Sequence, residues 1–488
     1  MGAIGCCSPQ GLPASLSPTL MTGKIVYMTI ASDAPNQPVL SIFFQLDPFH
    51  PTIGGIQTCI QYILKYAPEE IRIQLVGIAI GAKAIPNYQD NADNPGSSRV
   101  GQWQTVTLYG REFDFLPLLR VNDDNVRGLI PTTVKYAVAL RKYLKHHRIK
   151  SDFYQFHRIE PTIFTWGLSG TKLLYIHNDI YQEVKGNSRS KTAQKPGAKG
   201  GILWKRFPWA YFALERHLVK QFDRILSCNS DSTKLYQQQY PKIADRVSYL
   251  KNTFDSELFY PLSTTEKAIA RRQLAQAHNL PESTRFILFA GRLHPQKQPE
   301  LLIQAMAHLR AELAYCNVHL LIVGKGELET TVRQEIEKHN LQQHVSLLGS
   351  LPQHKLADLY RTCDLLALTS AYEGLARGSL ESLACGTPVV TTKAGETPNF
   401  LTENSGLVCG AAPKKIAEAW HQVLQHVNEF PSEACVQVAQ PYEARKVVTE
   451  LYDQLLVEWR EGSQSSSAAM NTQATKQDPG EKQLALKE

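Results

Sequence analysis

The chain has 488 residues, of which 43% are hydrophobic and 20% are charged, so it is long enough for two globular domains of ordinary size. Its net charge of +7 suits phosphate-bearing ligands or an anionic membrane surface, but it is too small to indicate a nucleic-acid-binding protein. The nine cysteines lie mostly in apolar stretches, which is typical of a reducing compartment, and no apolar run reaches the roughly 18 residues that span a bilayer. We therefore expect a cytoplasmic protein, in solution or peripheral on the cytoplasmic face of a membrane.

The first domain is expected over residues 23–255, after a disordered leader at 1–22 that is rich in Pro, Ser and Gly. Apolar patterning predicts strands at 24–30, 73–80, 152–157, 172–177, 224–227 and 247–251, and helices at 56–66 and 134–147. Gly54 and Gly55 stand just before the first of these helices. Glycine at a helix start lets the backbone come close to a ligand and present its amides, so the pair is a candidate binding element.

Two successive predicted strands of this domain end in histidine, at His157 and His177. Ligands of α/β sheets bind outside the carboxyl ends of the strands, which makes both residues candidates for a site. A single histidine in such a place is more often structural, but two in succession favour a function.

Residues 181–224 mix Lys and Arg with aromatic residues such as Trp204 and Trp209. This composition is typical of an element that lies on a membrane surface. A loop leading into a helix with core aromatics explains it equally well, and both interpretations stay open.

The second domain is expected over residues 256–440, with a C-terminal helix at 441–460 that packs back toward the first domain and a disordered tail at 461–488. Strand and helix patterns alternate at short spacing, which predicts a parallel sheet with helices on both faces. The predicted strands are 285–291, 317–324, 345–349, 365–369 and 388–391, and the predicted helices are 268–278, 299–314, 328–339, 355–362 and 375–385.

Two loops of this domain carry candidate phosphate-binding groups. Arg292 and Lys297 follow the first predicted strand, and together they have the charge to neutralise a diphosphate. Gly324 and Gly326 follow the second strand in a short Gly-x-Gly element. This element lacks the third glycine of a dinucleotide fingerprint, which argues against a nicotinamide or flavin enzyme.

The most informative stretch runs from Ser370 to Thr392. It places Glu373 and Gly374 in a loop, Glu381 near the opening turns of a helix, and a β-branched strand after Gly386. Free amides at a helix start take a phosphate, and carboxylates take the hydroxyls of ribose or sugar.

The stretch resembles the E-x7-E signature of retaining glycosyltransferases of family four, which have the GT-B fold. It matches at Glu373, Gly374, Glu381 and the run from 384 to 390, and departs at 375–376, where the family has an aromatic residue and glycine. The resemblance implies an α/β protein of two Rossmann-like, doubly wound parallel-sheet domains that face a central cleft.

The resemblance also implies roles for single residues. It puts Glu381 on the donor ribose, Glu373 near the sugar and the reaction centre, and Gly374 beside them. It puts Arg292 and Lys297 on the diphosphate, His157 beside the donor sugar, Gly54 and Gly55 near the diphosphate and the acceptor, and Gly324 and Gly326 near the base.

The expected function is transfer of a hexose, with retention, from a UDP- or GDP-linked sugar to a membrane glycolipid or lipid-linked saccharide. The sugar nucleotide is a co-substrate, and no cofactor is expected. The chain has no D-x-D motif, so we expect no metal requirement. A soluble sugar or metabolite is the alternative acceptor, and a catalytically silent sugar-nucleotide-binding protein is the alternative of another class.

Overall fold

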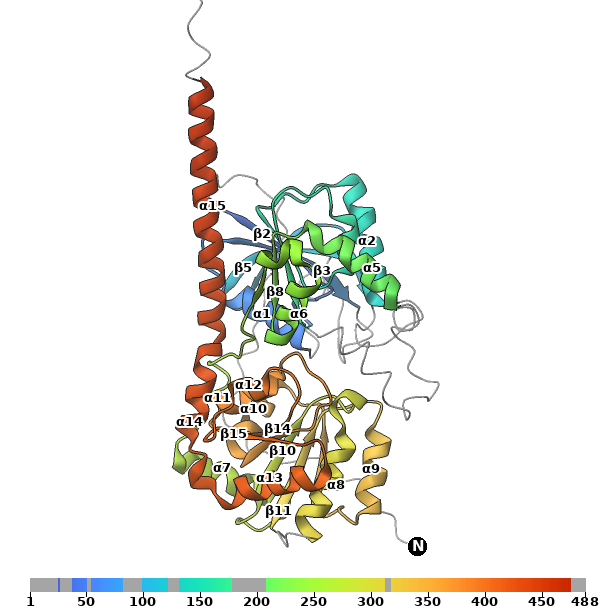
Figure 1. Cartoon of the computed structure of the whole chain (residues 1–488), viewed down its shortest axis with the longest axis vertical. Helices are drawn as coiled ribbons and strands as arrows, with labels where there is room; N and C mark the ends of the chain where they lie inside the picture. Colours follow the sequence, from blue (N-terminus) through green and yellow to red (C-terminus); the bar gives the residue numbers. More distant parts are fainter. Residues whose placement is uncertain are drawn as a thin grey trace, which may run out of the picture. The chain divides into compact units, whose positions relative to one another are not determined.

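The computed structural model describes residues 25–26, 37–50, 54–81, 99–121, 131–177, 208–311 and 317–474. The chain divides into two compact units, which we describe separately (Figure 1). The N-terminal unit comprises Gly23–Leu174, Leu218–Asp223 and the chain from Arg445 onward. The C-terminal unit comprises Tyr175–His217 and Arg224–Ala444.

The first sheet has nine strands in the order β1-β4-β5-β3-β2-β6-β7-β8-β9. Their bounds are β1 (Ile25–Val26), β2 (Val39–Phe43), β3 (Arg72–Ile80), β4 (Gln104–Leu108), β5 (Arg111–Val121), β6 (Phe153–Phe156), β7 (Thr171–Ile176), β8 (Arg224–Ser227) and β9 (Val247–Tyr249). β5, β3, β2, β6 and β7 pair in parallel, as do β8 and β9, whereas β4 runs antiparallel to β1 and β5. The sheet is therefore parallel in its middle and antiparallel at one edge.

The antiparallel edge is a hairpin that the sequence analysis does not predict. β4 and β5 are joined by Tyr109 and Gly110, both with positive φ, at 55° and 75°. Such two-residue turns match the twist of the strands they join, but their usual sequence signal is Asn-Gly or Asp-Gly. Because Tyr109 stands where Asn or Asp is usual, the sequence does not predict this turn.

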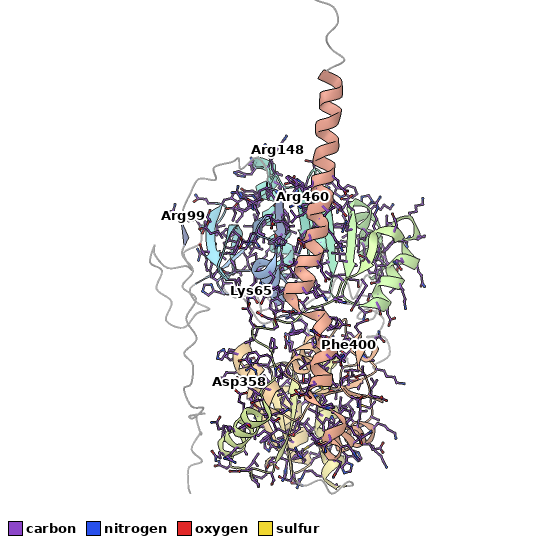
Figure 2. All side chains as sticks on the ribbon, turned by 90° about the vertical axis from the view of Figure 1, so that its left-hand side faces the viewer. Lys65, Arg99, Arg148, Asp358, Phe400 and Arg460 are labelled. Atoms are coloured by element: carbon purple, nitrogen blue, oxygen red, sulfur yellow. The ribbon has the colours of Figure 1, made fainter. Side chains whose placement is uncertain are left out.

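Among the described residues, the α-helices of the N-terminal unit are α1 (Gly55–Tyr66), α2 (Thr132–His146) and α15 (Ala444–Ala474). α15, on which Arg460 lies (Figure 2), is tied to β6 and its flank by two hydrogen bonds. The Tyr452 hydroxyl donates to Gln155 Oε1, and Trp459 Nε1 donates to Asp152 Oδ1 at 3.0 Å. The C-terminal helix thus contributes directly to the order of β6.

α15 continues to Ala474, which corrects the expectation of a disordered tail from residue 461 for the part up to 474. Residues 461–474 contain no proline and several good helix formers, including Ala468, Ala469 and Met470. Once packing has nucleated the helix, such residues extend it at little cost. The rest of the expected tail, and the leader at 1–22, lie outside the described residues.

The second sheet has six parallel strands in the order β12-β11-β10-β13-β14-β15. Their bounds are β10 (Arg285–Ala290), β11 (Val318–Val323), β12 (Val345–Gly349), β13 (Leu365–Leu368), β14 (Val389–Thr392) and β15 (Gly406–Cys409). The helices of this unit are α5 (Pro208–Leu218), α6 (Ser230–Gln239), α7 (Thr264–Ala277), α8 (Pro299–Ala311), α9 (Glu329–Lys338), α10 (Gln353–Thr362), α11 (Arg377–Ala384), α12 (Thr397–Phe400), α13 (Pro413–Gln425) and α14 (Ser432–Ala439).

Both faces of the second sheet are buried, and side chains alternate between them. In β10, Ile287 and Phe289 join a core with α8, α9 and α13, whereas Phe286 and Leu288 join a core with α7, α10, α11 and α14. This doubly wound arrangement confirms the predicted parallel sheet covered on both faces. It explains why the strands are continuous apolar runs in the sequence. Among the described residues, no helix is long and apolar enough to cross a membrane.

Candidate functional site

Four loops of the C-terminal unit begin where parallel strands end, and three of them carry predicted donor-site residues. The loops are 291–298 after β10, 324–328 after β11, 369–376 after β13 and 393–396 after β14. Because these strands are parallel and adjacent, their carboxyl ends meet at one edge of the sheet. Residues predicted separately from the sequence are thereby brought to one place.

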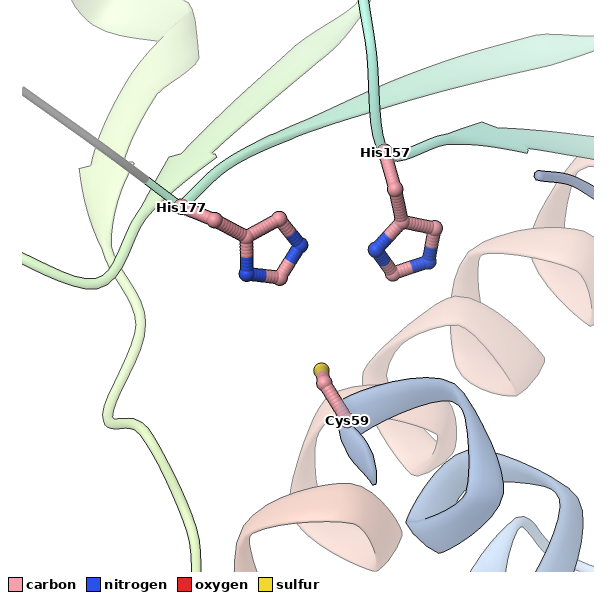
Figure 3. A group of neighbouring side chains, drawn as sticks. All are labelled: Cys59, His157 and His177. Atoms are coloured by element: carbon pink, nitrogen blue, oxygen red, sulfur yellow. The ribbon is translucent and has the colours of Figure 1, made fainter. Parts of the chain in front are cut away.

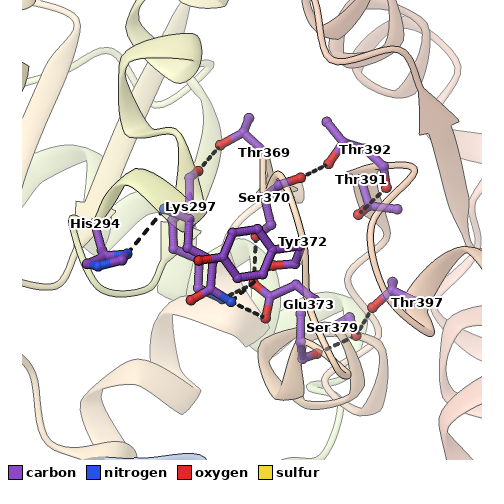
Figure 4. Close-up of polar contacts among 12 residues, drawn as sticks. His294, Lys297, Thr369, Ser370, Tyr372, Glu373, Ser379, Thr391, Thr392 and Thr397 are labelled. Atoms are coloured by element: carbon purple, nitrogen blue, oxygen red, sulfur yellow. Dashed lines mark hydrogen bonds and ion pairs between the residues drawn. The ribbon is translucent and has the colours of Figure 1, made fainter. Parts of the chain in front are cut away.

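The central contact at this edge is an ion pair between Lys297 and Glu373 (Figure 4). Lys297 closes the 3₁₀ helix η5 (Pro295–Lys297), and its side chain is 21% exposed, against 10% for Glu373. The Ser370 hydroxyl donates to Glu373 Oε1 at 2.7 Å, and Gln296 Nε2 lies 3.4 Å from Oε2. Both carboxylate oxygens are therefore held, and the carboxylate is fixed rather than mobile.

Backbone contacts join the loop after β10 to the loop after β13. The Thr369 hydroxyl donates to the Lys297 carbonyl at 2.7 Å, and the Ala371 amide donates to the Gln296 carbonyl at 2.8 Å. Gln296 Nε2 also donates to the Tyr372 carbonyl at 3.0 Å. These bonds set the position of Lys297 relative to Glu373 independently of their own ion pair. The sequence analysis did not identify these supporting residues. The only cue in the sequence is their position: Ser370 stands three residues before Glu373, and Gln296 stands next to Lys297.

The predicted glycines Gly324 and Gly326 are required by close packing of two backbones. A Cβ on Gly324, whose φ is +136°, would lie 1.9 Å from the Gly291 carbonyl oxygen. A Cβ on Gly326 would lie 2.1 Å from the Leu293 carbonyl oxygen. The Gly-x-Gly element therefore lets the loop after β11 pack against the loop that carries Arg292, which is exposed.

Gly374 is also held by packing within the C-terminal unit. A Cβ there would lie 2.6 Å from the His177 carbonyl oxygen, and Asn229 Nδ2 donates to the Gly374 carbonyl at 2.9 Å. Gly395, which the sequence analysis did not single out, lies against Glu373, where an added Cβ would be 2.6 Å from the Glu373 Cβ. Its φ of +68° independently favours glycine. The Glu373 loop is thus enclosed on both sides.

Glu381 is the fifth residue of α11 and is buried. Arg377 Nη2 lies 3.7 Å from Glu381 Oε1, and the Tyr360 hydroxyl also acts on this carboxylate. Burial raises the pKa of the Glu381 carboxyl, while Arg377 and the Tyr360 hydrogen bond act to lower it. The carboxylate is placed as expected near the start of a helix, with two partners that the sequence analysis did not name.

In the N-terminal unit, His157 follows β6 and is 3% exposed. Gln155 Nε2 lies 2.7 Å from His157 Nε2. Because the amide nitrogen donates, Nε2 of the ring is the acceptor, and the neutral ring carries its proton on Nδ1. Gln155 Oε1 also accepts from Tyr452 of α15, so the C-terminal helix fixes the orientation of the amide that contacts His157.

Gly54 is the N-cap of α1 and Gly55 is its first residue, so the helix begins one residue earlier than predicted. These glycines and His157 belong to the N-terminal unit, whereas Arg292, Lys297, Glu373, Gly374 and Glu381 belong to the C-terminal unit. We describe them as two separate sets of candidate residues.

One group of side chains among the described residues has the composition of a metal site. Figure 3 shows Cys59 of α1, His157 after β6 and His177 after β7. One ligand atom of each lies within 4.8 Å of the others. Thiolate and imidazole are ligands that Zn²⁺ accepts, so this group is the place where a test for metal should look.

The fold of the chain is similar to that of solved glycosyltransferase structures, and one segment of it matches a glycosyltransferase family. The two α/β units and their sheet orders define the GT-B fold, which sucrose-phosphate synthase from Thermosynechococcus elongatus shares with a TM-score of 0.65, at 18% identity over 86% of this chain and 100% of that one. Anabaena HepE in complex with UDP-glucose gives a TM-score of 0.57, at 18% identity, with the same coverage. Residues 270–433 match the family model of glycosyl transferases group 1. This match confirms, for that segment, the resemblance found in the sequence.

Curated relatives match a part of the chain. D-inositol 3-phosphate glycosyltransferase of Corynebacterium glutamicum is 29% identical over 211 residues, which is 42% of this chain and 50% of the relative. The protein of the same name from Stackebrandtia nassauensis is 30% identical over 211 residues, 41% of this chain and 46% of the relative. The chain thus spans about half the length of the curated relatives it matches.

Proposed function

We propose that the protein is a retaining glycosyltransferase that moves a hexose from a UDP- or GDP-linked sugar to a membrane-associated glycolipid or lipid-linked saccharide. The observation that carries the donor half of this proposal is the ion pair between Lys297 and Glu373 at the carboxyl edge of the second sheet. Lys297 offers a cation for the diphosphate and Glu373 offers a carboxylate for the sugar hydroxyls. Both residues lie in the segment 270–433 that matches the glycosyltransferase family model.

In the proposed reaction, the bond between the anomeric carbon and the diphosphate oxygen breaks while the acceptor oxygen attacks the same face of the sugar. The acceptor's hydroxyl proton passes to the departing diphosphate oxygen. Lys297 and Arg292 stabilise the negative charge that grows on the diphosphate. Glu373 holds the sugar hydroxyls, and Glu381 holds the ribose. His157 lies beside the donor sugar in this proposal and donates from its protonated Nδ1.

We further propose that the reaction needs no divalent metal and no cofactor. Lys297, Arg292 and helix amides supply the positive charge that a metal supplies in other transferases. Relatives of the same fold include one whose structure contains UDP-glucose, which supports a sugar nucleotide as the co-substrate.

For the acceptor, the support comes from an exposed basic face on α2 of the N-terminal unit. Between Pro131 and Lys150 the chain has six Lys and Arg and no Asp or Glu, and Arg148 of this stretch is labelled in Figure 2. Val134 and Val138 lie on the same face, 49% and 45% exposed, and Trp166, which follows the adjacent 3₁₀ helix η2 (Glu160–Phe164), is 48% exposed. Each basic side chain near an anionic membrane contributes about 1 kcal/mol of attraction.

We therefore propose this surface of α2 as a site of membrane contact, in addition to residues 181–224, to which the sequence analysis gave that function. Most of that stretch, 181–207, lies outside the described residues. Its described part, 208–224, contains α5, on which Trp209 is 71% exposed. We keep 181–224 as a second candidate for membrane contact. A peripheral position on the cytoplasmic face follows from this proposal.

A soluble acceptor is the alternative, and a specific observation favours it. The curated relatives are named D-inositol 3-phosphate glycosyltransferases, so a soluble sugar phosphate is the first acceptor to test against glycolipids. A silent sugar-nucleotide-binding protein is the alternative of another class, and it predicts binding without turnover.

Release of nucleoside diphosphate from a panel of UDP- and GDP-hexoses tests the donor half. We expect release from at least one donor, accelerated by the correct acceptor, whereas binding without release would favour the silent protein. Flotation with anionic vesicles at low salt tests the acceptor half. Val138→Ser with Trp166→Ser should weaken flotation, while Val427→Ser, at a site 40% exposed in the C-terminal unit, serves as the matched control. Failure of the wild type to float would favour the soluble acceptor.

A further inference from the structure

Arg377, Glu381 and Tyr360 form a buried polar group on one side of α11. Arg377 is the first residue of the helix and Glu381 lies one turn later, with 3.7 Å between Nη2 and Oε1. Each of these two side chains is only 10% exposed, so the pair differs from the solvated i,i+4 pairs of helix surfaces. Tyr360 of α10 is 1% exposed, and its hydroxyl lowers the pKa of the Glu381 carboxyl.

The close approach of Tyr360 depends on the residue that follows Arg377. A Cβ on Gly378 would lie 2.7 Å from the Tyr360 hydroxyl oxygen. Any larger residue at 378 would push the hydroxyl away from α11. Gly378 therefore allows the Arg377 guanidinium and the Tyr360 hydroxyl to be near Glu381 at the same time.

The charge of Glu381 depends on the balance of these groups. Burial is the largest influence and raises the pKa of its carboxyl, whereas Arg377 and the Tyr360 hydrogen bond lower it. The pKa of Tyr360 is raised well above its ordinary value, chiefly by burial, so this hydroxyl stays protonated and neutral throughout the working range. Without the guanidinium, burial would act against the carboxylate with only one neutral hydrogen bond to oppose it.

Two other cations lie near the end of α11: Arg361 of α10 and Lys267 of α7 act on Cys385, whereas Arg377 is the cation that acts on Glu381. Cys385, at the end of α11, has its pKa raised to about 12 by burial and stays neutral. From α14, Cys435 likewise has its pKa raised to about 12, and Glu433 acts on Cys435. β14 contributes no charged residue.

We propose that Arg377 is a positioning residue for the nucleotide: it keeps Glu381 ionised and aimed, so that the carboxylate accepts hydrogen bonds from the ribose hydroxyls of the donor. This inference rests on the proposed donor site and adds a residue whose role is neither in the diphosphate contacts nor in the reaction itself. An ionised carboxylate offers only acceptors, which suits two neighbouring hydroxyls, whereas the protonated form turns one oxygen into a donor.

The inference predicts a change in pH dependence rather than a uniform loss. In Arg377→Met, the carboxyl of Glu381 takes up its proton at higher pH than in the wild type. Affinity for UDP or GDP should therefore fall as the pH drops through the neutral range, by about tenfold for each unit of displaced pKa. At high pH and saturating donor, the maximal turnover should stay close to that of the wild type, because Arg377 touches no reacting atom in this proposal.

Calorimetric titration with UDP, GDP and inorganic pyrophosphate from pH 5.5 to 9 tests the inference. Pyrophosphate is the control ligand because it has no ribose, while its phosphate groups titrate in the same range. We expect an alkaline shift in the nucleotide profile of Arg377→Met, no shift with pyrophosphate, and recovery in Arg377→Lys, which keeps the charge.

An unshifted nucleotide profile in folded Arg377→Met, or an equal shift with pyrophosphate, would overturn the inference while leaving the donor site intact. If no nucleotide binds the wild type, both the donor site and this inference are wrong. If Arg377→Met does not fold, as judged by its unfolding transition, Tyr360→Phe is used instead. That variant removes the other group that favours the carboxylate, so a shift in the same direction supports the inference and an unshifted profile overturns it.

Discussion

Replacement of Lys297 by methionine is the change whose consequences the structure defines most fully. Methionine keeps much of the side-chain volume and removes the charge that pairs with Glu373. If the cation stabilises the departing diphosphate, turnover should fall by about 10²–10³-fold, the usual loss when one charge-stabilising group is removed from a reaction centre.

The same change should have a moderate effect on stability. The pair is neither a surface pair, worth at most about 1 kcal/mol, nor a fully buried one, whose disruption costs about 3–5 kcal/mol. With side chains 21% and 10% exposed, and with Ser370 and Gln296 still holding Glu373, we expect a loss of about 1–3 kcal/mol in the free energy of unfolding. This is more than a solvated loop charge would contribute.

Two variants separate these effects. Glu373→Gln in the Lys297→Met background removes the uncompensated carboxylate and should restore part of the stability without restoring turnover. Lys338→Ala removes an exposed lysine that pairs with Glu335 at 2.8 Å, and it should leave both quantities unchanged. Nucleoside diphosphate release and thermal unfolding are measured on all four proteins. Turnover of Lys297→Met equal to that of the wild type would refute the reasoning.

Three further predictions concern metal, packing and pH. Activity should persist after exhaustive chelation, and a strict requirement for added metal would contradict this and direct attention to Cys59, His157 and His177. Gly326→Ala should lower the free energy of unfolding by about 1–3 kcal/mol, because its Cβ would lie 2.1 Å from a carbonyl oxygen, and an unchanged melting temperature would be inconsistent with that packing. Burial, His278 and His344 lower the pKa of His319 to about 4, below the ordinary value of 6.5, so its contribution to stability is complete above pH 6.5 and is lost as the pH falls toward 4. Chemical denaturation at pH 7.5 and 4.5 should show a drop of up to about 3 kcal/mol that is smaller in His319→Gln, and an equal drop in both proteins would rule out His319 as its cause.

The alternation of strands and helices in the C-terminal unit could be predicted because each buried parallel strand is an uninterrupted apolar run. The run at 285–291 appears as β10, and the run at 388–391 appears as β14 with a shift of one residue. β15 was not predicted because it has only four residues and Val408 in it is 39% exposed. The helix that follows it, α13, was not predicted either. Short edge strands carry too little pattern to be recognised.

In the candidate site, too, some residues could be predicted from the sequence and others could not. The family resemblance put Lys297 and Glu373 at the same donor site, and the structure shows that the strands preceding them, β10 and β13, are neighbours in the sheet. The partners Gln296, Ser370 and Arg377 could not be selected from the sequence, because nothing local distinguishes a hydrogen-bonding side chain that points into the site from one that points to water. Their roles depend on loop conformations that only the folded backbone determines.

The central claim is that the edge of the second sheet binds a sugar nucleotide and transfers its sugar with retention. Proton NMR of the reaction, recorded as a UDP- or GDP-linked α-hexose is consumed, tests it most directly by showing the anomeric configuration of the first product. We predict accumulation of nucleoside diphosphate together with an α-linked product, and neither signal with Lys297→Met. A β-linked first product, or equal consumption of the donor by the wild type and Lys297→Met, would contradict the claim.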